Sequence, residues 1–210
     1  MRILVTGSDT DVGKTELCRV LLAQWKARGR SVSYVKPVQC GVDALGRGDR
    51  ERVGAGVCLQ HFERPIAPLA AARAEGKRLD WDAWLESLEG ISGTGDIVLV
   101  EGAGGIAVPL DEAGRDWADF ARAFSADWVL VVVSLKLGGV NQSRLAESYA
   151  RSRGLNTIVI FSESKPCEEE VAASTLSGAR ESGVRVGAVL AQGAGSLRVL
   201  DKSLERSLGL

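Results

Sequence analysis

Several residue types and patterns on which common protein functions depend are scarce in this chain. Its 210 residues include one histidine, His61, so we expect neither a Ser-His-Asp triad nor a histidine-rich metal site. The four cysteines form no C-x-x-C pair, which argues against a zinc site or a disulfide framework. The 26 basic and 27 acidic residues nearly cancel, so no bulk charge favours nucleic acid or an anionic membrane. No apolar run approaches the ~18 residues of a membrane span, and the N-terminus lacks a signal-peptide core. We therefore expect a cytoplasmic protein.

Glycine, in contrast, is abundant, with 25 residues. The hydrophobic fraction of 45% and the charged fraction of 25% are ordinary for a folded globular chain. The length predicts one domain over residues 1–210, and we find no internal repeat or linker that would divide it. The glycine excess therefore calls for positions where the backbone turns sharply or approaches a ligand closely.

Short apolar runs alternate with longer amphipathic stretches along the chain. The runs are rich in Val, Ile and Leu without polar alternation, as in parallel strands buried on both faces: Ile3–Thr6, Ser31–Val35, Asp96–Val100, Trp128–Val133, Thr157–Phe161 and Val184–Leu190. The predicted helices are Lys14–Arg28, Trp117–Phe124, Ser143–Arg153 and Cys167–Ser182, with shorter ones around 69–75 and 80–89. Gly29, Gly154 and Gly183 stand where helices end. This alternation predicts an α/β fold with a parallel sheet between helix layers.

The strongest motif follows the first predicted strand and opens the first predicted helix. The segment Gly7–Thr15 reads GSDTDVGKT, and Gly13-Lys14-Thr15 is the ending of a phosphate-binding loop. Its backbone amides and the helix dipole favour phosphate. Lys14 is expected to reach the terminal phosphates, and the Thr15 hydroxyl to bind Mg²⁺. The spacing is longer than usual, because five residues separate the two glycines rather than four.

Two carboxylates inside this loop need an explanation, because they repel a triphosphate. Asp9 either caps the start of the helix or has a functional role, and the sequence favours neither. Asp11 is better explained by a substrate that carries amines.

Polar chemistry also follows other predicted strands, at the sheet edge where ligands of open α/β folds bind. Glu101 ends a buried strand and precedes Gly102 and Gly104, so we expect it to help to hold Mg²⁺. Lys36 ends another strand, and it would stabilise a transferred phosphoryl group or be a surface lysine. Asp49 is open between a further Mg²⁺ ligand and a member of a solvated charged run.

A last segment, Lys136–Asn141, follows the fourth long strand and resembles a strand-to-helix entry. Backbone donors at such a helix start can bind a carboxylate, although a plain turn explains the segment equally well. The five tryptophans are expected in the core or on helix faces, and His61 is assigned no role.

Four of these segments together resemble the dethiobiotin synthetases, the penultimate enzymes of biotin synthesis. The match runs through Gly7-x-Asp-Thr-x-x-Gly-Lys-Thr15, Lys36-Pro37-Val38-Gln39-x-Gly41, Glu101-Gly102-Ala103-Gly104-Gly105 and Lys136-Leu137-Gly138-x-x-Asn141, in the family's order. The resemblance implies a P-loop NTPase-like fold. It also implies an ATP- and Mg²⁺-dependent ligase that closes a cyclic urea from 7,8-diaminopelargonate and CO₂, through a carbamate and a carbamic–phosphoric anhydride. A homodimer is implied as well, in which the substrate tail crosses to the neighbouring subunit.

The resemblance assigns roles residue by residue. The catalytic residues would be Lys14, Lys36 and Thr10. ATP would contact Asp11, Val12, Gly13, Lys14, Thr15, Glu101, Gly102, Gly104 and Ser162, and Mg²⁺ would be held by Thr15, Asp49 and Glu101. The substrate would contact Thr10, Asp11, Lys36, Cys40, Gly104, Gly138 and Asn141.

Some positions depart from the family pattern. Cys40 replaces the usual Ser or Thr and is a weaker hydrogen-bond donor. Gln142 stands where His is frequent. The base-recognition segments lack their usual Asn-Asp, where Ser162 and Glu163 stand, and their proline, in the segment 187–190. We therefore expect relaxed nucleobase selectivity, with other nucleoside triphosphates accepted beside ATP. A nucleotide-driven switch or partitioning ATPase of the same superfamily is the alternative, but the loop lacks the early lysine common in that class.

Overall fold

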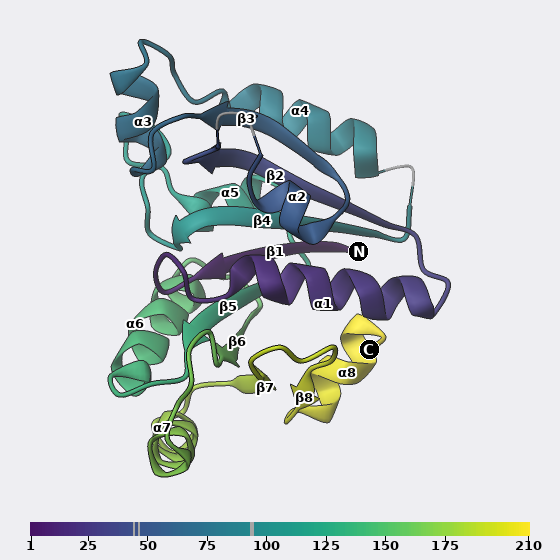
Figure 1. Ribbon diagram of the computed structural model, residues 1–210, viewed down its shortest axis with the longest axis vertical. Coiled ribbons are helices and arrows are strands. Elements are labelled where there is room, and N and C mark those ends of the chain that lie inside the picture. Colours follow the sequence, from purple (N-terminus) through teal and green to yellow (C-terminus); the bar gives the residue numbers. More distant parts are fainter. Residues whose placement is uncertain (44, 46, 93–94) are drawn as a thin grey trace.

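The computed structural model describes residues 1–43, 45, 47–92 and 95–210 (Figure 1). Its strands form one sheet in the order β3-β2-β4-β1-β5-β6-β7-β8, parallel except for the β7–β8 pair. Their bounds are β1 Arg2–Gly7, β2 Val32–Cys40, β3 Val57–Phe62, β4 Ile97–Gly105, β5 Trp128–Ser134, β6 Thr157–Ser162, β7 Val186–Leu190 and β8 Arg198–Val199. All six predicted strands are confirmed. Two short strands, β3 and β8, were not predicted.

Helices cover both faces of this sheet. Their bounds are α1 Lys14–Ala27, α2 Asp49–Val53, α3 Pro68–Ala74, α4 Trp81–Ser92, α5 Trp117–Ala123, α6 Gly139–Ser152, α7 Glu169–Glu181 and α8 Lys202–Leu208. The predicted helix Ser143–Arg153 begins four residues earlier, at Gly139, because Gly138 adopts a left-handed conformation and ends the preceding turn. Helices α2 and α8 were not predicted. Gly29, Gly154 and Gly183 have φ values of 71°, 75° and 83°, as their helix-end role requires.

One core lies between the sheet and the helices α1 and α8. Leu17 and Leu21 of α1 pack with inward residues of the central strands and with Leu204 of α8. The indole Nε1 of the buried Trp25 donates a hydrogen bond of 2.7 Å to the carbonyl oxygen of Leu208. The helix that carries the phosphate loop is thereby attached to the last helix of the chain.

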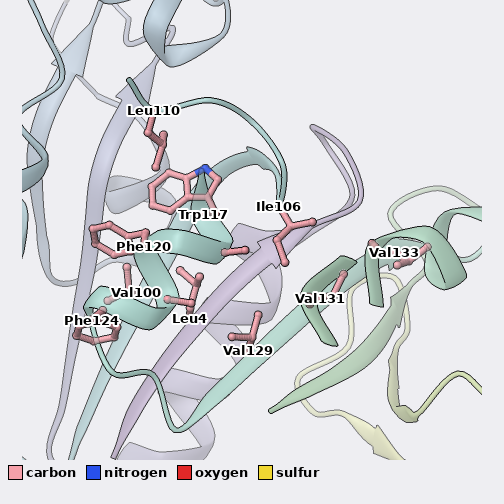
Figure 2. Close-up of a cluster of buried hydrophobic side chains, with 14 of the residues drawn as sticks. Leu4, Val100, Ile106, Leu110, Trp117, Phe120, Phe124, Val129, Val131 and Val133 are labelled. Carbon is pink, nitrogen blue, oxygen red and sulfur yellow. The ribbon is translucent and has the colours of Figure 1, made fainter. Parts of the chain in front are cut away.

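The other core contains most of the aromatic side chains. Trp117 and Phe120 of α5, and Phe124 directly after it, lie over the opposite face of the sheet. There they meet Leu4 and Val129 (Figure 2). The rings of Trp81 and Phe120 meet edge to face with their centroids 5.2 Å apart. All five tryptophans are buried, as expected. Among the described residues, no helix has both the length and the apolarity to cross a bilayer.

The strand register brings the predicted functional segments together. Strand β1 lies between β4 and β5, and Gly7 pairs with Gly105 at its carboxyl end. Val35 of β2 pairs with Val100 of β4, so Lys36 and Glu101 are the next residues on neighbouring strands. The phosphate loop, Lys36 and Glu101 therefore share one edge of the sheet.

Candidate active site

The phosphate loop joins the carboxyl end of β1 to the start of α1. Gly13 ends the loop with φ of 99°, and a Cβ at this position would lie 2.4 Å from the Oγ atom of Ser162. Asp11 is also left-handed, with φ of 55°, which is uncommon for a residue with a side chain. Only glycine fits position 13, so its place beside the end of β6 depends on the missing side chain.

Lys14 folds back over this loop. Its Nζ atom donates a hydrogen bond of 2.8 Å to the carbonyl oxygen of Asp9, and the residue is 7% exposed. Burial lowers the pKa of Lys14 to about 8, and the nearby charge of Lys36 acts in the same direction. The ammonium group thus lies in the loop where a phosphate group is expected.

Glu101 is the centre of the site, and it is fully buried. Its Oε1 atom accepts a hydrogen bond of 2.8 Å from the Thr15 hydroxyl and lies 2.7 Å from Lys36 Nζ. Its Oε2 atom accepts a hydrogen bond of 2.7 Å from the Tyr34 hydroxyl. Both oxygens of a buried carboxylate are therefore satisfied, as burial of a charge requires.

Lys36 bridges two carboxylates. Its Nζ atom lies 2.7 Å from Asp49 Oδ2 and 2.7 Å from Glu101 Oε1. Burial lowers the pKa of Lys36, but the two carboxylates outweigh this effect and raise the pKa above its ordinary value. For Asp49, burial raises the pKa, whereas Lys36 beside it brings the net shift below the usual range. Lys36 is thus a buried cation rather than a surface lysine, and Asp49 is part of the site rather than of a solvated run.

These groups open into a cleft of about 1140 Å³. Ten of the predicted site residues line it: Thr10, Asp11, Gly13, Lys14, Thr15, Lys36, Cys40, Asp49, Glu101 and Gly104. Its wall also includes Arg47 and Arg52, which the sequence did not single out.

The remaining predicted residues lie outside the wall of this cleft. Val12 is buried in the core below the loop, and Gly102 packs against the Trp117 ring. Ser162 is buried at the end of β6, beside Gly13. Gly138 and the exposed Asn141 lie at the start of α6.

Comparison with known proteins identifies the family. A family model described as an AAA domain matches residues 1–192. An ATP-dependent dethiobiotin synthetase of Parafrankia sp. is 36% identical, and the alignment covers 99% of this chain and 93% of that protein. The protein of the same name from Gloeobacter violaceus is 39% identical over 80% of this chain and 74% of its own length. The chain belongs to the dethiobiotin synthetase family. It is therefore an enzyme of the ligase class.

Solved structures of other proteins share the fold of this dethiobiotin synthetase family member. Cell division protein FtsY from Thermotoga maritima matches with a TM-score of 0.58 at 19% identity, covering 99% of this chain and 67% of FtsY. The signal recognition particle 54 kDa protein from Aeropyrum pernix, in complex with GDP, matches with a TM-score of 0.58 at 22% identity. The match covers 99% of this chain and 46% of that protein. At such identities the likeness shows the fold alone, a P-loop NTPase-like α/β sandwich.

The oxygen atoms around Lys36 are of the kind that bind a divalent cation. Within the described residues, no group of three or more His, Cys, Asp or Glu side chains is placed to hold a metal. The donor set is instead two carboxylates, Asp49 and Glu101, with the Thr15 hydroxyl, and the Lys36 ammonium already lies between the carboxylates. Mg²⁺ is typically held by one or two carboxylates together with substrate phosphates, so this donor set suits it.

Sequence reasoning missed two residues that touch Glu101. Tyr34 lies two positions before Lys36 on β2 and so faces the same side of the sheet. The thiol of Cys18, on α1, also lies against the Glu101 carboxylate, and burial together with that charge raises its pKa. A tyrosine and a cysteine within apolar runs are typical core residues, so no sequence signal pointed to the site.

Proposed function

We propose that this protein catalyses the ATP- and Mg²⁺-dependent ring closure of 7,8-diaminopelargonate with CO₂ to dethiobiotin, in biotin synthesis. The observation that carries the proposal is the second buried cation: Lys36 extends from β2 into the same cleft as Lys14 of the phosphate loop. A nucleotide phosphate and a second anion can be held side by side there. The names of the relatives support the product, dethiobiotin, and the dependence on ATP.

The reaction needs three reactants in one place. One amine of the substrate attacks CO₂ and loses a proton, which gives a carbamate. An oxygen atom of the carbamate attacks the γ-phosphorus of ATP, and ADP leaves. The second amine then attacks the carbonyl carbon of the mixed anhydride and loses a proton, the C–O bond to phosphate breaks, and inorganic phosphate leaves. The last step is intramolecular because both amines belong to one molecule, and much of the enzyme's contribution to bringing diamine, CO₂ and ATP together is positioning.

Lys14 and Lys36 supply the positive charge for these steps. Lys14 leaves the Asp9 carbonyl group and binds the β- and γ-phosphates, and Lys36 binds the carbamate. Thr15, Asp49 and Glu101 would hold Mg²⁺, which would supply positive charge to the phosphates. Lys36 would then share the two carboxylates with the cation.

The cleft wall beside the loop holds the diamine in this proposal. Asp11 is the only carboxylate among the predicted diamine contacts, so it attracts an ammonium group of the substrate. Thr10 and Gly104 flank it, and a Cβ at position 104 would lie 3.9 Å from the Thr10 Oγ1 atom. Cys40 lines the same cleft, but burial raises the pKa of its thiol to about 11, so it acts as a neutral weak donor.

The start of α6 takes part in a homodimer in this proposal. Gly138 and Asn141 do not line the cleft of their own chain, so they can bind the substrate tail only in a neighbouring cleft. Leu137 and Leu145 are 86% and 65% exposed in the same region, which supports an apolar contact there. Mixing the inactive variants Lys14→Ala and Asn141→Ala tests this arrangement. Shared sites would restore up to about a quarter of the wild-type activity in a random mixture of dimers, whereas no recovery would mean that each chain works alone.

A coupled assay tests the proposed reaction. The purified protein is supplied with diaminopelargonate, bicarbonate, Mg²⁺ and ATP, and dethiobiotin and phosphate are measured together. We expect the two products in equal amounts and no phosphate without the diamine. Diamine-independent release of phosphate would instead favour the nucleotide switch, which no observation on the described residues supports over the ligase.

A further inference from the structure

Tyr34 makes a contact that the proposed reaction does not use. The side chain lies on β2 and is 1% exposed, and its hydroxyl donates a hydrogen bond of 2.7 Å to Glu101 Oε2. A phenol has an ordinary pKa of about 10 and carries its proton at neutral pH, so the hydroxyl is the donor and the carboxylate is the acceptor.

The Tyr34 ring has little freedom to move. It belongs to the core between the sheet and α1. Gly56 packs so closely that a Cβ there would lie 2.7 Å from the Tyr34 Cδ1 atom and 2.1 Å from its carbonyl oxygen. The ring position is thus set by packing on both sides, and the hydroxyl is a fixed point toward which the carboxylate must orient.

The two oxygen atoms of Glu101 have different neighbours as a result. Oε2 faces Tyr34, whereas Oε1 faces both the Thr15 hydroxyl and the Lys36 ammonium. Rotation of the carboxylate out of its plane would break the hydrogen bond from Tyr34, and both side chains are buried, so an unsatisfied polar group there would be costly. Oε1 is therefore the oxygen that remains directed at the cation position.

We propose that Tyr34 is a positioning residue, which holds Glu101 so that Oε1 is presented to the divalent cation of the nucleotide complex. This inference rests on the proposed role of Glu101 as an Mg²⁺ ligand. Tyr34 touches neither nucleotide nor substrate in this proposal and acts only through the carboxylate. Loss of such a partner behind a metal ligand typically costs about 10–100-fold in metal affinity or activity.

The chain offers a matched pair of variants for the test. Tyr34→Phe removes one hydroxyl from the site. Tyr149→Phe removes the other tyrosine hydroxyl of the chain, which also donates to a carboxylate, that of Asp116 at the start of α5. Both changes delete one hydrogen bond to an acid, but only the first touches Glu101.

The readout is the factor by which saturating Mg²⁺ tightens ADP binding, measured by calorimetry in EDTA and in Mg²⁺. We expect Tyr34→Phe to bind ADP like the wild type in EDTA and to reduce this factor by about tenfold, while Tyr149→Phe leaves it unchanged. A factor within twofold of the wild type in Tyr34→Phe would overturn the proposal, whatever happens to the melting temperature. In a Glu101→Gln background the Tyr34→Phe effect should vanish, and its persistence would equally reject action through Glu101.

The test also separates this inference from the proposed reaction. If the wild type makes no dethiobiotin, the proposed function fails, but the effect of Mg²⁺ on ADP affinity still tests the role of Tyr34. If the wild type makes dethiobiotin and Mg²⁺ tightens ADP binding equally in Tyr34→Phe, only the positioning role is rejected.

Discussion

Replacement of Lys36 by methionine tests how strongly the charged cluster is coupled. The variant keeps an unbranched side chain that is one atom shorter, but it removes the cation that lies 2.7 Å from each of two carboxylates. Breaking a buried pair typically costs about 3–5 kcal/mol of stability, because a charge is left uncompensated. Glu101 keeps its bonds from Thr15 and Tyr34, and Asp49 is 17% exposed and partly solvated, so we expect the lower end, about 3 kcal/mol.

The cost of Lys36→Met should depend on pH in a defined direction. In the wild type the pKa of Asp49 is lowered, so its ionised form adds stability above its unfolded pKa of about 3.9 and loses it as the pH falls through the folded value. Without Lys36, burial still raises the pKa of Asp49 and only the Thr15 hydrogen bond and the Arg52 charge lower it, so we expect its pKa in the variant to lie above the wild-type value. The difference in stability between wild type and variant should therefore shrink as the pH falls from 7 through the pKa of the variant towards the lowered wild-type value.

Thermal melting at several pH values measures this effect. For a chain of this length, about 3 kcal/mol corresponds to a fall of roughly 6–12 °C in melting temperature. Lys77→Met is the control, because Lys77 pairs with Glu75 at 3.0 Å but is 55% exposed, and such pairs contribute less than about 1 kcal/mol. Equal melting temperatures for the two variants would refute the claim that Lys36 compensates the buried carboxylates.

Three further predictions concern the nucleotide. The pKa of Lys14 is about 8, so above pH 8 the lysine must take up a proton when ADP binds, and ADP affinity should fall by up to about tenfold per pH unit. Lys14→Arg should abolish this pH dependence in a calorimetric titration. Gly13→Ala should destroy ADP binding, because φ is 99° and the added Cβ would lie 2.4 Å from the Ser162 Oγ atom. Gly29→Ala is the control: φ is 71° there, but no atom lies within 4 Å of the added Cβ, so the change should cost only about 1 kcal/mol in stability and leave ADP binding intact. Because Ser162 and Glu163 replace the expected Asn-Asp pair, kcat/KM should differ little between ATP, CTP and GTP, and a large preference for ATP would contradict relaxed selectivity.

The sequence predicted the central strands well, for a physical reason. Strands buried on both faces are unbroken runs of Val, Ile and Leu, and β5 is such a run. Edge strand β3 contains Gln60 and an exposed His61, so its pattern is too mixed to distinguish from a loop. Helix α2 has five residues, and β8 has two, which is too few for any periodicity to appear.

The site was predictable where a motif fixed it. Lys14 and Thr15 follow β1, and Glu101 lies in the neighbouring parallel strand β4, so their convergence follows from the parallel topology. The ion pair between Lys36 and Asp49 was not predictable, because Asp49 lies outside the strands and its position does not follow from the sheet topology. Tyr34 was missed because a tyrosine in an apolar strand is most simply interpreted as core.

The contact between Trp25 of α1 and Leu208 of α8 has a consequence for folding during translation. Helix α1, which begins at Lys14, emerges early from the ribosome, but part of its apolar face is covered by Leu204 and Leu208 of the last helix. Until residues 202–208 have been translated, the part of that face that they cover lacks this packing. A chain whose nucleotide site begins at residue 7 completes the packing beneath that site only when residues 202–208 have joined it.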